Sequence, residues 1–206
     1  MNSDCVAFSL SNPLRWVILW GLVLIVGCSS GVDPISIHDP TIPTSDRRLI
    51  ADGEDRVAAA RAQYDDAALR LRRTTNWRSN LLTHADWPAD ATGLVTSVHR
   101  LVDARLALME LQVERAAIEI ELAQTELTLL VARVAVRNDR AVYDLQALRD
   151  DVDDVKEDAR GLDRQIMQQV ESLDEVTQRW WQEYAAYAQR GGDVVPFYGA
   201  FDRPRR

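Results

Sequence analysis

The sequence predicts an all-α protein, a long antiparallel helical hairpin or coiled coil in which one helix is very long. Apolar residues recur at heptad spacing through most of residues 47–190, which is the pattern of helices that pack along their length. The stretch from Gly93 to Arg190 has almost no helix-breaking residue. Breakers gather instead in the segment Asp86–Gly93 and at Gly191-Gly192, so these segments are expected to bound the long helix.

The first 27 residues are predicted to be a signal peptide and not part of the fold. Arg15 precedes the apolar run Trp16–Val26, whose roughly eleven residues are too few to cross a bilayer that needs about 20. The run ends in Ile25-Val26-Gly27-Cys28. This junction resembles the lipobox of bacterial lipoproteins, in which the Cys is acylated and becomes the first residue of the mature chain. The resemblance implies a lipid such as palmitate on Cys28, and the alternative is a secretory signal with a coincidental Cys.

The residue after the lipobox bears on the location of the protein. Ser29 occupies the position where an Asp signals inner-membrane retention in that family, so the resemblance implies a periplasm-facing outer-membrane lipoprotein. Anchoring in the inner membrane stays open as an alternative. Because Cys5 would be removed with the signal, Cys28 is the only cysteine expected in the mature chain, and an internal disulfide is excluded.

A linker and a first helix are expected next. Residues 28–46 contain three prolines, which favour an extended tether between the lipid and the helices. A helix over about 47–85 is expected to begin after Ser45 or Asp46, either of which can cap it, and to stop at Asp86-Trp87-Pro88. Its heptad positions are Ile50, Val57, Ala60, Tyr64, Ala67 and Leu71.

The long helix is predicted over about 94–190, and two apolar seams run side by side through its first half. A single antiparallel partner covers one seam, so the second seam predicts another partner: a second copy in a homo-oligomer, or another helical envelope protein. The first seam comprises Val102, Leu106, Met109, Val113, Ala116, Ile120, Ala123, Leu127, Leu130 and Val134. The second comprises Leu101, Ala104, Leu108, Leu111, Ile118, Leu122, Leu129, Ala132 and Val136.

The heptad spacing slips between Val134 and Leu145, where Arg137 and Asp144 would fall on the buried face. One interpretation is a stutter, an inserted four-residue step that leaves the helix continuous. The alternative is a turn near Arg137–Arg140, which would fold the chain into a three-helix bundle. Because no Gly or Pro is present there, the sequence favours the continuous helix.

Residues 191–206 are an aromatic and basic tail after the last helix. Trp180, Tyr184 and Tyr187 share one helix face just before it, and Phe197 in the tail can fold back on them. One interpretation is a local cap that closes the end of the helices. The other is a docking tip for a partner or an envelope polymer.

Composition and motifs narrow the function. With 32 acidic and 24 basic residues the net charge is −8, so nucleic acid is not an expected partner. The acidic run Asp150–Asp158 lacks the Gly of a calcium-binding EF-hand loop and is interpreted as a solvated helix face. His84 and His99 flank the corner between the two predicted helices. They could bind zinc only if the corner brings both of them close to Asp86 or Asp90. The chain has no recognisable catalytic or cofactor motif, so we expect no enzyme, no cofactor, no metal and no small-molecule substrate.

These observations predict a lipid-anchored lipoprotein of the bacterial envelope with a structural, tethering or scaffold role. Its partners would be the membrane, through the lipid, and helical proteins. The alternative is an accessory subunit of an envelope export or efflux assembly, because the Ala- and Leu-rich segment Leu106–Val136 resembles the helical hairpins of outer-membrane efflux channels. A metal-binding or enzymatic lipoprotein is a distant third possibility.

Overall fold

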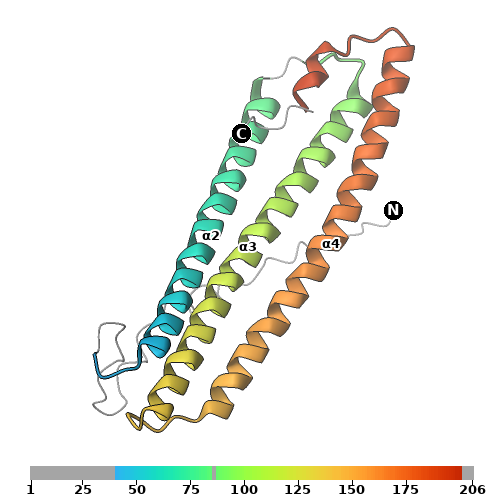
Figure 1. Ribbon diagram of the computed structural model, residues 1–206. Coiled ribbons are helices and arrows are strands. Elements are labelled where there is room, and N and C mark those ends of the chain that lie inside the picture. Colours follow the sequence, from blue (N-terminus) through green and yellow to red (C-terminus); the bar gives the residue numbers. More distant parts are fainter. Residues whose placement is uncertain (1–39, 85–86, 201–206) are drawn as a thin grey trace. The chain divides into compact units, whose positions relative to one another are not determined.

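The computed structural model describes residues 40–84 and 87–200, which form three long α-helices and a short 3-10 helix. Helix α2 spans Thr44–His84, α3 spans Thr92–Arg137 and α4 spans Leu145–Gln189, and the 3-10 helix η2 spans Val195–Ala200. Consecutive long helices run antiparallel and side by side (Figure 1). The all-α class is therefore confirmed, and the three-helix bundle that was the alternative is the arrangement found. None of the described helices combines the length and apolarity needed to span a membrane.

Helix α3 is the central helix of the bundle. It packs against α2 and against α4, whereas α2 and α4 have no comparable contact with each other. Toward α2, Gly53 lies so close to α3 that an added Cβ would be 2.8 Å from Cδ1 of Leu127 in the first seam. Toward α4, the Nε2 of Gln169 donates a hydrogen bond of 3.0 Å to the carbonyl oxygen of Ala104 in the second seam. Both seams are thus used within one chain, each by a different helix.

The continuous helix predicted over 94–190 is wrong, because α3 ends at Arg137 and α4 begins at Leu145. Helix α3 ends in a Schellman motif, in which the Asp139 N–H donates to the carbonyl of Val136 (3.2 Å) and the Arg140 N–H to that of Ala135 (2.9 Å). Asp139 has a left-handed φ of 54°, a conformation usually taken by Gly. Asp is one of the few other residues that adopt it readily, so the helix stops without a glycine.

Helix α4 begins at an N-cap. The carboxylate of Asp144 accepts hydrogen bonds of 3.0 Å from the backbone N–H groups of Gln146 and Ala147. Arg137 and Asp144, the two polar residues that interrupt the heptad spacing, therefore mark a helix end and a helix start. Their positions have this local cause, and no stutter is needed to explain them.

Helix α4 ends at Gln189, and Arg190 separates it from the Gly191-Gly192 pair expected to stop it. The Gly191 N–H donates to the carbonyl of Ala188 (3.0 Å) and the Gly192 N–H to that of Tyr187 (3.1 Å). Gly191 has a φ of 81°. This is the same Schellman motif as at the end of α3, here with glycine in the left-handed position.

The two clusters of buried side chains lie at the two ends of the bundle. Near the start of α2, Ile42, Ile50 and Val134 form a small cluster. No residue of α3 from Met109 to Thr128 is fully buried, because two neighbouring helices leave part of its surface uncovered. The larger cluster, at the end where α4 finishes, comprises Ala91, Leu94, Val98, Leu101, Val102, Trp180, Tyr187 and Phe197.

Helix α4 covers the seam that predicted a partner outside the chain. Leu101, Leu108 and Leu129 of the second seam are buried, and Leu111 and Ile118 are half-buried. Helix α4 therefore packs on the seam that was expected to contact a second copy or another helical protein. Self-association stays a prediction, but this seam no longer gives a reason for it.

Candidate functional site

The predicted lipidation site, Cys28, lies outside the described residues, as do the signal peptide 1–27 and most of the 28–46 linker. The described chain starts at Pro40, four residues before α2. Residues 40–44 therefore identify the end of the bundle at which the linker arrives. We call it the anchor end, and it also contains the α3–α4 turn (Figure 1).

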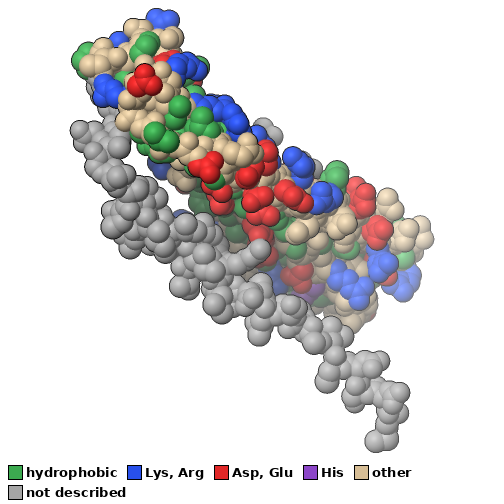
Figure 2. Space-filling view, turned by 90° about the horizontal axis from the view of Figure 1, so that it is seen from below, with side chains coloured by type: hydrophobic (Ala, Val, Ile, Leu, Met, Phe, Trp, Pro, Cys, Tyr) green, Lys and Arg blue, Asp and Glu red, His purple; other side chains and the backbone are tan. Residues whose placement is uncertain are grey.

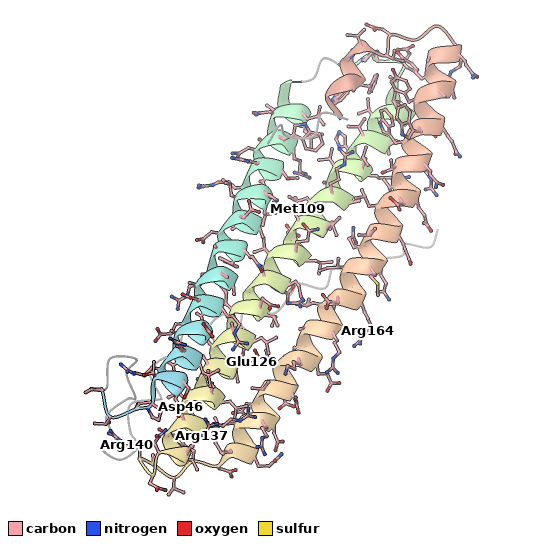
Figure 3. All side chains as sticks on the ribbon, viewed as in Figure 1. Asp46, Met109, Glu126, Arg137, Arg140 and Arg164 are labelled. Atoms are coloured by element: carbon pink, nitrogen blue, oxygen red, sulfur yellow. The ribbon has the colours of Figure 1, made fainter. Side chains whose placement is uncertain are left out.

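A buried carboxylate joins the start of α2 to the end of α3. Asp46 is 2% exposed, and its two oxygens accept hydrogen bonds from Nη1 of Arg137 (2.9 Å) and Nδ2 of Asn138 (3.1 Å). The same Asn138 amide group also donates to the carbonyl of Val134 (2.8 Å). Figure 3 shows Asp46 and Arg137 together at this end. Sequence reasoning assigned Asp46 only a capping role, because its partners are 91 and 92 positions away.

The α3–α4 turn, residues 138–144, is held against the segment before α2. The guanidinium of Arg140 donates to Oγ1 of Thr41. Within the same turn, Val142 is 100% exposed and Tyr143 is 44% exposed. The turn is thus fixed at both of its ends and presents an aliphatic and an aromatic side chain to the surroundings. The sequence signal for this exposed pair is the run Ala141-Val142-Tyr143, which the predicted continuous helix included.

A shallow cleft of about 260 Å³ is lined by residues of all three helices. Glu126 of α3 is one of these residues, with Oε2 3.4 Å from Nη1 of Arg56 on α2 and Oε1 3.3 Å from Nζ of Lys156 on α4. Lys156 is the only lysine of the chain. These charges connect neighbouring helices. The cleft is lined by Arg56, Glu126, Leu129, Leu130, Arg133, Val152 and Lys156.

Arg115 interrupts the second seam and makes a second connection between helices. Its Nη1 lies 2.7 Å from Oε2 of Glu119 on the same helix, and its Nε lies 2.9 Å from Oδ1 of Asp163 on α4. Burial favours the neutral guanidine, but the hydrogen bonds to Glu119 and Asp163 outweigh it and raise the pKa of Arg115. The interruption of the seam is therefore an ion pair between α3 and α4.

An aromatic cluster closes the end of the bundle opposite the anchor end. The ring of Phe197, in η2, lies with its centroid 4.9 Å from that of Trp87 and 5.9 Å from that of Tyr187. Phe197 and Trp180 are fully buried, as the cap interpretation of the tail expects. Trp181 is 51% exposed, and the centroid of its ring lies 5.0 Å from that of Trp180 and 5.7 Å from that of Tyr184. The side chain of Tyr198 and all of residues 201–206 lie outside the described residues.

Tyr187 links this aromatic cluster to the corner between α2 and α3. Its hydroxyl donates a hydrogen bond of 3.0 Å to Oδ1 of Asp90. Burial, and then this bond to a carboxylate, raise the pKa of Tyr187 above its ordinary value. Folding therefore favours the neutral, protonated form of the Tyr187 hydroxyl.

The other candidates from the sequence form no described site. The acidic side chains of the run Asp150–Asp158 are exposed, as expected for a solvated helix face. His99 is exposed, while the side chain of His84 and residue Asp86 lie outside the described residues. Among the side chains that are described, no three His, Cys, Asp or Glu residues are grouped closely enough to hold a metal ion.

Comparison with known proteins adds no relative. The chain matches no protein-family model, and neither the curated proteins nor the solved structures give a significant match. Its function is therefore inferred from its residues and its fold.

Proposed function

We propose that this protein is a lipid-anchored lipoprotein of the bacterial envelope, with a lipid on Cys28 and a structural, tethering or scaffold role for its helices. The observation that carries the proposal is the apolar run Trp16–Val26 ending in Ile25-Val26-Gly27-Cys28. An acylated Cys needs such a run to bring it to the membrane, and the run here stops at the Cys. Ser29 favours the outer membrane as the final location.

The helices support a mechanical role. Each of α2, α3 and α4 has between 41 and 46 residues. At 1.5 Å per residue such helices extend about 60–70 Å. The charged side chains that lie between helices, such as Arg115 with Asp163 and Glu126 with Arg56, are engaged in holding neighbouring helices together. A bundle of this kind suits a spacer between the membrane and another envelope component.

Lipidation is tested by the substitution Cys28→Ala with Cys5→Ala as the matched control. We expect labelled fatty acid to enter the wild type and the Cys5→Ala variant, because Cys5 lies in the segment removed with the signal. The Cys28→Ala variant should remain unlabelled and should leave the membrane fraction. Equal labelling of both variants would refute the proposal. If only Cys28→Ala loses the label, separation of the two membranes shows which of them holds the wild type.

Crosslinking in cells followed by purification distinguishes a tether from an accessory subunit of an export assembly. A tether should be recovered with cell-wall material, with another helical envelope protein or with copies of itself. An accessory subunit should be recovered with transporter components. The second result would replace the tethering role and leave the lipid anchor in place.

A further inference from the structure

We infer that the α3–α4 turn is a lipid-contact surface, which places Val142 and Tyr143 in the membrane interface and sets the direction of the bundle. The inference rests on the proposed lipid anchor at Cys28. It goes beyond that anchor because a lipid on a linker holds a protein at the membrane without determining which way it points.

The turn has the side chains that an interfacial contact needs. Val142 is 100% exposed and the adjacent Tyr143 is 44% exposed, so both present apolar surface to the surroundings. Tyrosine is enriched at membrane interfaces, where its ring lies in the apolar region and its hydroxyl stays in contact with water. An aliphatic side chain beside it gains free energy by leaving water for the boundary of the acyl chains.

The backbone on either side keeps these two side chains in position. The Schellman motif at Asp139 ends α3, and the N-cap at Asp144 begins α4 four positions after Arg140. The turn is therefore a short connection between two fixed helix ends. Little ordering of the chain is needed for it to meet a surface.

The turn also lies at the end of the bundle that the lipid can reach. Arg140 contacts Thr41, and Asp46 holds Arg137, so the turn is attached to the residues at which the linker enters α2. Cys28 and Thr41 are 13 positions apart in the sequence. That length of chain spans at most about 45 Å, whereas α2 alone is about 60 Å long. The anchor end is therefore the part of the bundle that the lipid keeps near the membrane.

The turn carries charges of both signs, of which the two arginines can meet phospholipid headgroups. The side chain of Arg137 is 63% exposed, and Arg140 is exposed beside the apolar pair. The carboxylate of Asp144 is directed to the N–H groups of α4 as its cap, whereas that of Asp139 is exposed between the two arginines. Figure 2, viewed from this end of the bundle, shows hydrophobic, basic and acidic side chains next to one another on the near part of the surface. Arginines beside apolar residues are typical of surfaces that bind phosphate headgroups and enter the interface.

The test uses the mature lipoprotein in vesicles of phosphatidylethanolamine and phosphatidylglycerol. The chain has two cysteines, Cys5 in the signal peptide and Cys28 at the lipidation site, so Val142→Cys introduces a unique free thiol for a polarity-sensitive fluorophore. Val195→Cys is the matched control, because Val195 is 65% exposed and belongs to η2, beyond the far end of α4. We expect the label at position 142 to emit at shorter wavelength and to be quenched by brominated acyl chains, and the label at position 195 to show neither change.

The possible results distinguish failure of this inference from failure of the proposed lipid anchor. If the protein floats with the vesicles and the two labels behave alike, the inference is overturned while the lipid anchor stands. If the wild-type chain does not float, the proposed anchor itself fails, and the inference fails with it. If label 142 is shielded in native membranes but not in pure lipid, the turn binds a protein and the inference is again overturned.

A second measurement tests the effect on orientation. Energy transfer from a label at Val195→Cys to acceptors in the vesicle surface reports the height of the far end of the bundle. Adding Val142→Asp and Tyr143→Ser should bring this end closer to the surface and increase the transfer, with flotation unchanged. Equal transfer with and without these two substitutions would contradict the inference.

Discussion

Asp46 should be one of the most important polar side chains for the stability of this bundle, and the substitution Asp46→Ala tests this. The carboxylate is 2% exposed and accepts hydrogen bonds from Arg137 and Asn138. Its removal leaves two donors from the end of α3 without their acceptor. Because these bonds join the start of α2 to the start of the α3–α4 turn, their loss should loosen the anchor end.

The size of the effect follows from the two bonds. A hydrogen bond that involves a charged group contributes about 1.5–3 kcal/mol. The side chain of Arg137 is 63% exposed, so water can replace part of its bond, and the Asn138 amide keeps its bond to the Val134 carbonyl. We therefore expect Asp46→Ala to lower the free energy of unfolding by about 2 kcal/mol. Asp46→Asn keeps an acceptor oxygen and should cost about half as much.

Urea denaturation followed by far-ultraviolet circular dichroism measures this loss. Asp52→Ala is the control for removing a carboxylate from the same helix, because Asp52 is exposed. The double substitution of Asp46 and Arg137 gives the coupling energy of the pair. If Asp46→Ala costs no more than Asp52→Ala, the reasoning from burial and partners is refuted.

Three further predictions concern single side chains. Asp139→Gly should raise the free energy of unfolding by about 1 kcal/mol, because glycine takes the left-handed conformation without strain; an equal loss would show that the Asp139 side chain has a stabilising contact. The stability contributed by Tyr187 should be constant below its ordinary pKa of 10.0 and fall as the pH rises through its raised folded pKa, since the ionised ring is buried beside Asp90. Unfolding measured against pH should show this fall in the wild type and less of it in Tyr187→Phe. Glu126→Gln should cost less than about 1 kcal/mol, and salt should reduce the cost, because its partners are partly exposed; a larger, salt-independent loss would mean that the cleft is a buried ionic site.

Much of the helical architecture could be predicted from local signals in the chain. Heptad spacing predicted helix over the residues that α2, α3 and α4 occupy, although it joined α3 and α4 into one. The Pro88 corner separated α2 from α3, and the glycine pair marked the end of α4. The two seams on α3 correctly required two neighbouring helices. These features depend on residues a few positions apart, and the helix period and steric restrictions on proline and glycine act over that distance.

The α3–α4 turn was decided by chemistry that the sequence signals ambiguously. The backbone hydrogen bonds at Asp139 and at Gly191 form the same Schellman motif. Only the glycine is a clear sequence signal for it, because aspartate is more often found in other conformations. The partners that hold the turn in place, Asp46 and Thr41, are distant in sequence and close only after folding.

The sequence also could not show which helix covers the second seam, and only the tertiary structure determines it. Heptad spacing shows that Leu101, Leu108 and Leu129 must leave water, but a helix of the same chain and a helix of another chain satisfy that requirement equally. The hydrophobic effect is non-directional and depends on the area buried, so the pattern on α3 carries no information about its partner. Only the turn at residues 138–144, which directs α4 back along α3, determined that the partner lies within the chain.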